Sequence, residues 1–384
     1  MFIFETKIIN RRTMPEKKYK IALVGFSLSK GGGEKVMANL SIFLEKKGIE
    51  VHIITVLDGV VFPYSGKHFN MGLLKNDNNN FVNKFKRLVH LRRYLKANNF
   101  DFIIDFRPRT KVIQEFVISR FVYKAKTILT IHSFLINYYM PKSVWLTQLI
   151  YKKNYATIAI VPEIKELVEY KYNLQNITSI YNSVNLDEIN KKGNINIQID
   201  YDYIIAIGQY VDNIKQFDKL ILSYANSILH QKNIHLVIIG SGNKDVLTKV
   251  IRDNNIQNFV HLLGFKNNPF KYLRKAKFLV LSSKNEGFPN VLLESLASNT
   301  PVVAFDCSCG PSIIIEHKKN GLLVENQNLE KLTEAMNLFV KDEKLYNYCK
   351  ENAFDSIQQF SLDNIGKQWL DLMKIDIYNK TNTQ

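Results

Sequence analysis

The fold is decided at residues 278–294, which read FLVLSSKNEGFPNVLLE. The run Phe278–Ser282 is short and almost continuously apolar, which predicts a β-strand covered on both faces. Gly287 and Pro289 then favour a turn, and proline suits the first turn of a helix. The stretch therefore predicts a strand, a turn and a helix in that order, which is typical of a parallel α/β sheet.

Two carboxylates flank this predicted turn. Glu286 lies in the turn, and Glu294 lies about one and a half turns into the following helix. A carboxylate accepts paired hydrogen bonds from neighbouring hydroxyl groups, such as those of ribose or a sugar ring. The helix N-terminus between the two can hold a diphosphate, at the end of a parallel sheet where ligands bind. The alternative is an ordinary acidic turn with a glutamate on the surface.

The same alternation of strand-like runs and helical periodicity extends over nearly the whole chain. Two series of about equal length predict two Rossmann-like, doubly wound domains, at residues 15–190 and 196–360. The polar stretch Asn185–Asp202 has no convincing periodicity and is the predicted linker. The predicted strands are Lys20–Phe26, Val51–Leu57, Phe102–Phe106, Thr127–Ile131, Thr157–Val161, Ile177–Tyr181, Tyr203–Ile207, His235–Ile239, Val260–Leu263, Phe278–Ser282, Val302–Phe305 and Gly321–Val324.

Composition excludes several classes of protein. The 384 residues suit about two domains, and no apolar run is long enough to span a membrane. Three cysteines cannot form a disulfide framework, which fits a reducing cytosol. Residues 1–190 hold 29 basic and 15 acidic side chains, a net charge of +14, whereas the remainder holds 23 and 20, a net charge of +3. The first domain is therefore expected to face an anionic partner, unless the excess of lysine serves solubility alone.

The segment Phe81–Lys96 predicts a basic amphipathic helix. Phe81, Phe85, Leu88 and Leu95 fall on one helical face, and six lysine or arginine side chains surround it. Such a helix can lie on an anionic membrane. It can equally pack its apolar side on the sheet and leave its lysines in water.

Three loops are candidates for binding phosphate or sugar. Gly31, Gly32 and Gly33 follow the first predicted strand and open a helix, where free backbone N–H groups attract anions. Gly240-Ser241-Gly242 resembles half of a dinucleotide fingerprint, but its third glycine is missing, so NAD binding is not expected. Arg107-Pro108-Arg109 follows a predicted strand, and Arg107 and Arg109 either bind an acceptor phosphate or lie in a solvated loop.

Residues 285–294 resemble the signature of glycosyltransferase family 4, in which seven residues separate two glutamates. Further segments resemble the same family in the same order: Gly31–Val36, Tyr181–Asn185, Pro301–Cys307, Gly310-Pro311 and Asn320–Val324. The resemblance spans about residues 20–375. It implies the GT-B fold, with a cleft between two Rossmann-like domains and a final helix, at 361–376, that returns to the N-terminal domain. It also implies a retaining transferase that needs no metal and no cofactor.

The resemblance implies roles for single residues. Glu294 would hold the ribose of the donor, Glu286 the hydroxyls of the donor sugar, and Lys215 the diphosphate, where negative charge develops in the transition state. His132 would contact the sugar. Glu286, His132 and Lys215 are thus the expected catalytic residues. The other expected donor-binding positions are Gly208, Gln209, Gly242, Gly287, Phe288, Pro289, Asn290, Val291 and Leu292.

Gln209 departs from the family pattern, which has arginine at this position. A neutral amide offers phosphate no charge and fewer hydrogen bonds. The substitution supports the alternative of a protein of the same fold that binds glycan or nucleotide without turnover. Nucleic-acid binding would rest on charge alone, without any recognised motif, and is not expected.

The combined expectation is a glycosyltransferase at the cytoplasmic face of the plasma membrane. The C-terminal domain would bind a nucleotide-sugar, most simply a UDP-sugar, and would supply a hexose or N-acetylhexosamine. The basic N-terminal domain would bind a saccharide acceptor, linked to a polyprenyl diphosphate or part of a lipopolysaccharide core. The expected setting is the biosynthesis of bacterial cell-surface polysaccharide, with an anionic membrane surface as a further partner.

Overall fold

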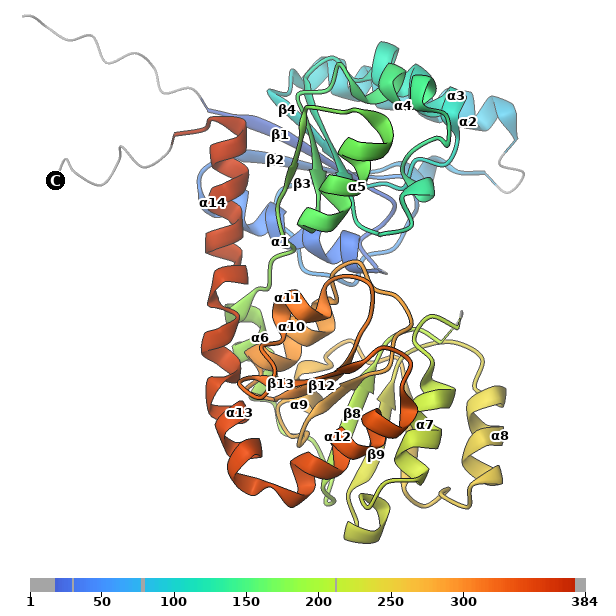
Figure 1. The fold of residues 1–384 in the computed structure, drawn as a ribbon. Coiled ribbons are helices and arrows are strands. Elements are labelled where there is room, and N and C mark those ends of the chain that lie inside the picture. The colour runs from blue at the N-terminus through green and yellow to red at the C-terminus, as the bar shows by residue number, and fades with distance from the viewer. Residues whose placement is uncertain (1–17, 30, 77–79, 211–212, 377–384) are drawn as a thin grey trace, which may run out of the picture.

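The computed structural model describes residues 18–29, 31–76, 80–210 and 213–376. The chain forms two parallel sheets, one above the other in Figure 1, each covered by helices. The predicted start of the first domain, at residue 15, lies outside the described residues. None of the described helices is long and apolar enough to cross a membrane.

The N-terminal domain contains a sheet of seven parallel strands, ordered β3-β2-β1-β4-β5-β6-β7. The strands are β1 (Lys20–Gly25), β2 (Glu50–Thr55), β3 (Lys67–Asn70), β4 (Phe102–Asp105), β5 (Lys126–Ile131), β6 (Ala156–Ala159) and β7 (Ile177–Ser179). The helices are α1 (Gly32–Lys46), α2 (Phe81–Asn98), α3 (Val112–Val117), α4 (Val144–Tyr151) and α5 (Pro162–Tyr172), with short turns η1 (Met71–Leu74), η2 (Ile118–Val122) and η3 (Ile136–Tyr138).

The C-terminal domain contains a sheet of six parallel strands, ordered β10-β9-β8-β11-β12-β13. The strands are β8 (Tyr203–Ile207), β9 (His235–Ile239), β10 (Val260–Gly264), β11 (Leu279–Leu281), β12 (Val302–Asp306) and β13 (Gly321–Glu325). The helices are α6 (Leu186–Gly193), α7 (Phe217–Ala225), α8 (Asp245–Asp253), α9 (Phe270–Leu273), α10 (Asn290–Ala297), α11 (Pro311–Ile314), α12 (Leu329–Lys341) and α13 (Glu343–Ser356), with η4 (His230–Lys232) and η5 (Gln358–Phe360). The last helix, α14 (Leu362–Met373), packs into the core of the N-terminal domain.

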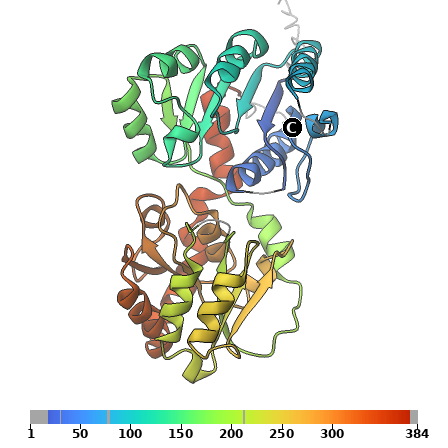
Figure 2. The same ribbon diagram turned by 90° about the vertical axis from the view of Figure 1, so that its right-hand side faces the viewer.

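Both sheets reverse their strand order at the first strand of the domain. In the N-terminal sheet β1 lies between β2 and β4, and in the C-terminal sheet β8 lies between β9 and β11. Ligands bind at such reversal points, outside the carboxyl ends of the strands. The two sets of loops face each other across the space between the domains, as Figures 1 and 2 both show.

The chain crosses between the domains twice, and the two crossings are paired. Val184 donates a hydrogen bond to the carbonyl of Phe360, and Leu362 donates one back to the carbonyl of Val184. Helix α14 then packs against α1 of the N-terminal domain (Figure 1). Gly366 allows this contact, because a Cβ there would lie 2.5 Å from the ring of Phe43. The predicted return of the final helix to the N-terminal domain is therefore confirmed.

All twelve predicted strands form, and the structure adds one strand and differs from the sequence pattern in two helices. Strand β3 was not predicted, because its residues Lys-His-Phe-Asn are only partly buried at the sheet edge. The predicted linker contains α6, which packs on the C-terminal domain through Ile189. Helix α2 buries Arg87, Leu91 and Leu95, whereas Phe81 and Phe85 are 82% and 57% exposed. The apolar stripe of that helix is therefore split between the core and the surface.

Candidate active site

The predicted strand, turn and helix form as β11, the turn and α10, and both glutamates face the space between the domains. Glu286 lies in the turn and accepts a hydrogen bond from Lys215 Nζ at 2.5 Å. Glu294 is the fifth residue of α10 and accepts one from Lys35 Nζ, also at 2.5 Å. Their side chains are 13% and 11% exposed. Both carboxylates line one cavity of about 660 Å³, which is large enough for a nucleotide-sugar.

The cavity walls combine cations with apolar surface. Lys215, Lys35, Lys192 and Lys266 line it, and so do the side chains of Phe265 and Phe270. Phosphate oxygens suit the ammonium groups, and a nucleobase and a sugar ring suit the apolar walls. The remaining predicted residues that line it are Gly208, Gln209, Phe288, Pro289, Asn290, Val291, Gly31 and Gly32.

A second, smaller chamber adjoins the turn on the side of the N-terminal domain. Its volume is about 310 Å³, and Glu286, Gly287, His132, Gly33 and Glu34 contribute to its walls. Glu286 lines both spaces and thus lies where they meet. Only glycine fits at position 287, because a Cβ there would lie 2.8 Å from the carbonyl oxygen of His132. The two domains are therefore in close contact beside the candidate reacting centre.

His132 is a neutral histidine at the wall of this chamber. Its ring stacks on Phe106 with the centroids 5.5 Å apart, and neither ring nitrogen has a hydrogen-bond partner among the described residues. Burial, reinforced by the positive charge of Arg109, lowers the pKa of His132 to about 3. The ring therefore carries no charge near neutral pH and has hydrogen-bonding capacity left for a ligand.

Glu34 and Lys35 belong to the site, although the sequence analysis gave them no role. Burial raises the pKa of Glu34 to about 7, so this carboxyl in the smaller chamber is protonated in part near neutral pH. Lys35 reaches Glu294 from the other domain. Their position in the first turn of α1, directly after the three glycines, is the sequence feature that could have predicted a place in the site.

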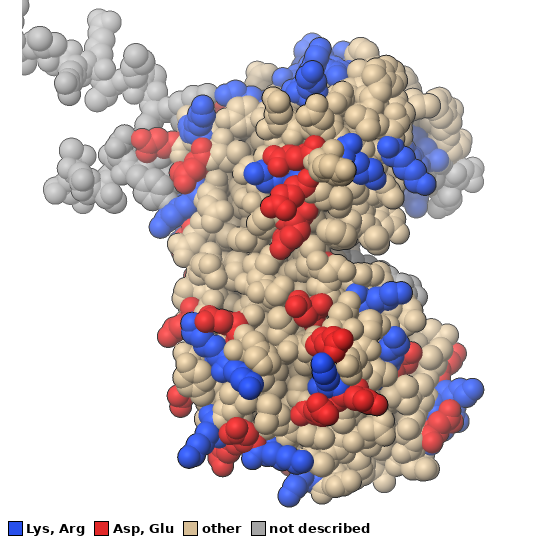
Figure 3. All heavy atoms as spheres, viewed as in Figure 1, with Lys and Arg blue, Asp and Glu red and all other residues tan. Residues whose placement is uncertain are grey.

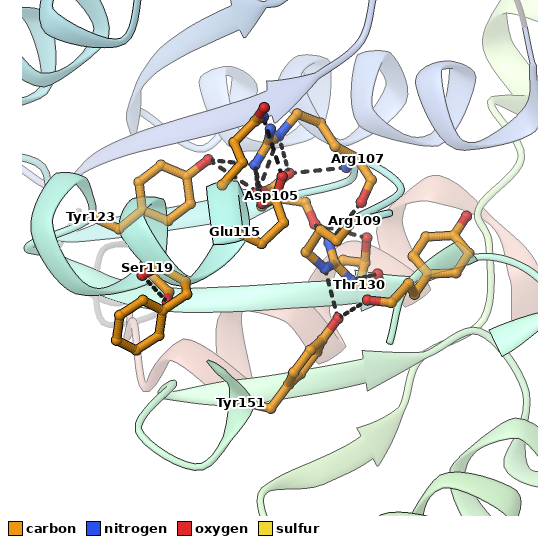
Figure 4. A network of polar contacts seen from close by, with 11 residues as sticks. Asp105, Arg107, Arg109, Glu115, Ser119, Tyr123, Thr130 and Tyr151 are labelled. Carbon is orange, nitrogen blue, oxygen red and sulfur yellow. Dashed lines mark hydrogen bonds and ion pairs between the residues drawn. The ribbon is translucent and has the colours of Figure 1, made fainter. Parts of the chain in front are cut away.

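The two alternatives predicted for Arg107 and Arg109, an acceptor-phosphate site and a solvated loop, were both wrong. The two residues are only 5% and 3% exposed, and their guanidinium groups lie in a buried network (Figure 4). Arg107 bonds Asp105 and Glu115, whereas Arg109 donates to the hydroxyl of Tyr151 at 2.7 Å and to carbonyl oxygens behind the loop. Neither guanidinium is open to a phosphate.

Two of the residues predicted to contact the donor, Leu292 and Gly242, are not placed to do so. The backbone N–H of Leu292 donates to the carbonyl of Pro289 at 3.0 Å, and the residue is fully buried, so it has no free donor for a sugar. Gly242 is not part of the cavity wall. It packs on Tyr210, where a Cβ would lie 2.5 Å from the ring, and so it supports the loop that places Gly240 and Ser241 in the wall.

Comparisons with known proteins agree with this architecture. A model of Glycosyltransferase Family 4 matches residues 30–188, and one of Glycosyl transferases group 1 matches residues 187–356. The chain is 28% identical over 366 residues to the N-acetylgalactosamine-N,N'-diacetylbacillosaminyl-diphospho-undecaprenol 4-alpha-N-acetylgalactosaminyltransferase of Campylobacter jejuni, covering 91% of this chain and 98% of that one. It is 30% identical over 225 residues to the poly(ribitol-phosphate) alpha-N-acetylglucosaminyltransferase of Staphylococcus aureus, covering 53% and 45%.

Solved structures show the same fold at low sequence identity. TarM of Staphylococcus aureus, solved as a mutant with fondaparinux, alpha-GlcNAc-glycerol and UDP, superposes with a TM-score of 0.73 at 18% identity, over 92% of this chain and 99% of that one. HepE of Anabaena, in complex with UDP, superposes with a TM-score of 0.72 at 16% identity, over the same shares.

Two Rossmann-like domains that enclose a cleft lined by both carboxylates define a glycosyltransferase of the GT-B class. The chain belongs to the glycosyltransferases, since the Glycosyltransferase Family 4 model and the Glycosyl transferases group 1 model together match residues 30–356.

Proposed function

We propose that the protein transfers a hexose or N-acetylhexosamine from a UDP-sugar to a lipid-linked saccharide, with retention of anomeric configuration. The observation that carries the proposal is the placement of Glu286 and Glu294, eight residues apart, in one cavity that also contains four lysines. The names of the two relatives above specify alpha-linked N-acetylhexosamines. UDP-N-acetylhexosamines themselves carry the sugar in an alpha linkage, so the same outcome here would be retention.

Each residue has a role that its position supports. Glu294 accepts hydrogen bonds from the ribose, and Glu286 accepts them from hydroxyls of the donor sugar. Lys215 exchanges its bond with Glu286 for one with the diphosphate, where it stabilises the charge of the departing group. The acceptor enters through the smaller chamber. There the neutral ring of His132 forms one hydrogen bond with a sugar hydroxyl, either as donor or as acceptor. None of these roles requires a metal.

Selective stabilisation by nucleotides tests the donor class. We expect UDP to raise the melting temperature of the protein, and GDP, ADP and CMP to have little effect, because a ligand that binds only the folded state stabilises it. The matched control is Glu294→Gln, in which the shift caused by UDP is expected to shrink. A larger shift with GDP or ADP would contradict the assignment of UDP.

A lipid-linked acceptor is anchored in a membrane, so the protein would bind it at an anionic membrane surface. Leu73, Phe81, Val82 and Phe85 are more than half exposed near the start of α2, among exposed lysines. In Figure 3, basic side chains gather at the upper and right-hand edges of the N-terminal domain, whereas both signs mix over the C-terminal domain. Apolar side chains among lysines favour the interface of an anionic bilayer.

Flotation with liposomes tests this surface. We expect the protein to float with vesicles that contain phosphatidylglycerol at low salt and to be released by about 1 M NaCl, which shortens the range of electrostatic attraction. Replacing both Phe81 and Phe85 by serine is expected to lower the bound fraction at least threefold. Tyr170→Ser, at a 92% exposed position on α5, serves as the control. Equal flotation of both variants would contradict a role for α2.

A further inference from the structure

Lys35 reaches across the cleft from the N-terminal domain and bonds the C-terminal domain. It lies in the first turn of α1, and its Nζ is 2.5 Å from Glu294 Oε1 and 4.6 Å from the centre of the Phe270 ring. The side chains of Lys35 and Glu294 are only 19% and 11% exposed. A partly buried charged pair of this kind is less screened by salt and solvent than a surface pair.

Other polar contacts join the two domains at the same place. The amide of Asn182 donates to Asn290 Oδ1 at 2.9 Å, and Asn290 Nδ2 lies 3.4 Å from the carbonyl oxygen of Gly32. Asn290 and Glu294 lie on α10, whereas Gly32 and Lys35 lie on α1. The first turn of α1 is therefore attached to the helix that carries Glu294, and the ion pair is the charged part of that attachment.

The same carboxylate is required by the donor. Under the function proposed above, on which this inference rests, Glu294 accepts hydrogen bonds from the ribose. The ammonium of Lys35 bonds one oxygen of that carboxylate, Oε1. If the two neighbouring hydroxyls of the ribose take both carboxylate oxygens, one of them competes with the ammonium for Oε1, and a ligand that wins this competition also removes a bond between the domains.

We propose that Lys35 is a positioning residue that acts as a donor-sensitive latch. While Lys35 bonds Glu294 it holds α1 against α10, and binding of the donor ribose to Glu294 releases it. Donor binding and the arrangement of the acceptor domain are then coupled, because the free energy of the broken ion pair is part of the free energy of donor binding.

Uridine separates this role from simple attraction of phosphate, because it has the ribose but no charge. We expect Lys35→Met to bind uridine about threefold more tightly than the unaltered protein in isothermal titration, since the competitor is gone. The gain for UDP is expected to be smaller, because the variant also loses a positive charge from the cavity. Lys46→Met, at an exposed position near the end of the same helix, is the matched control and should leave both affinities unchanged.

The salt dependence gives a second test that does not depend on the folding of a variant. In the unaltered protein, uridine affinity should rise slightly between about 0.05 and 0.5 M NaCl, because salt weakens the competing ion pair, although less than it would weaken a pair at the surface. Unchanged uridine affinity in Lys35→Met, together with weaker UDP binding, would make Lys35 a phosphate ligand and overturn the latch. If the unaltered protein bound neither uridine nor UDP, the proposed function and the latch would both be overturned, whereas normal UDP binding without any effect of Lys35 on uridine would overturn the latch alone.

Discussion

Glu286→Gln is expected to lower the rate of sugar transfer about a hundred- to thousandfold while leaving nucleotide binding within about twofold of the unaltered protein. Removal of one preorganised electrostatic group from a catalytic site has effects of this size. Glu286 lies where the two chambers meet, 2.5 Å from Lys215. The amide keeps the shape of the side chain but removes the charge that orients the lysine and accepts two hydroxyl bonds. Under the proposed function, the nucleotide is held by α10 near Glu294.

The measurement is the release of UDP from a panel of UDP-sugars, in parallel with the thermal shift caused by UDP. Glu316→Gln is the control, since the side chain of this glutamate is 63% exposed and its carboxylate bonds only Lys319 among the described residues. Full activity in Glu286→Gln would place the reaction elsewhere. Loss of UDP binding together with activity would mean that Glu286 supports the nucleotide. Nucleotide binding without turnover in the unaltered protein would favour the alternative that Gln209 suggests, a binding protein of the same fold.

Arg109→Met is expected to lower the free energy of unfolding by about 3–5 kcal/mol, the range found when one member of a buried charged network is removed. Arg109 is 3% exposed and donates to the hydroxyl of Tyr151, the carbonyl of Arg107 and the carbonyl of Thr130. Methionine fills part of the space but leaves these oxygens without donors. The remaining charges of Asp105, Glu115 and Arg107 would then sum to −1 in a buried region.

Thermal and urea denaturation measure this effect, with an expected fall in melting temperature of about 10 °C for a domain of this size. Arg93→Met, at an exposed position on α2, is the control and should change stability by less than about 0.5 kcal/mol. A stable Arg109→Met variant that had lost only its affinity for acceptor would restore the phosphate-binding role that the structure contradicts. The expected cost comes from the network, because the charges and hydrogen bonds of Arg107, helped by Arg109, hold the pKa of Asp105 below its ordinary value against the opposing effect of burial.

The sequence by itself determined the elements that depend on local pattern. Continuous apolar runs predicted twelve strands, and the spacing of Glu286 and Glu294 around a Gly-Phe-Pro turn predicted a strand, a turn and a helix, which the structure places at the cavity between the domains. These elements can be predicted from sequence because a strand buried on both faces must be apolar along its whole length. A turn between strand and helix also needs particular backbone conformations, which favour particular residues. Strand β3 lacked such a signal, since its partly exposed edge position does not demand apolar residues.

Only the tertiary structure decided which charged side chains are free and which are paired. In the sequence, Arg107 and Arg109 have the pattern of a basic loop. The fold nevertheless places Asp105, Glu115 and Tyr151 around them. Lys35 and Glu294 are 259 residues apart in the chain, and no local pattern connects them. The physical reason is that a helix or strand is formed by neighbours in sequence, whereas the environment of a charge depends on groups brought near it by packing from anywhere in the chain.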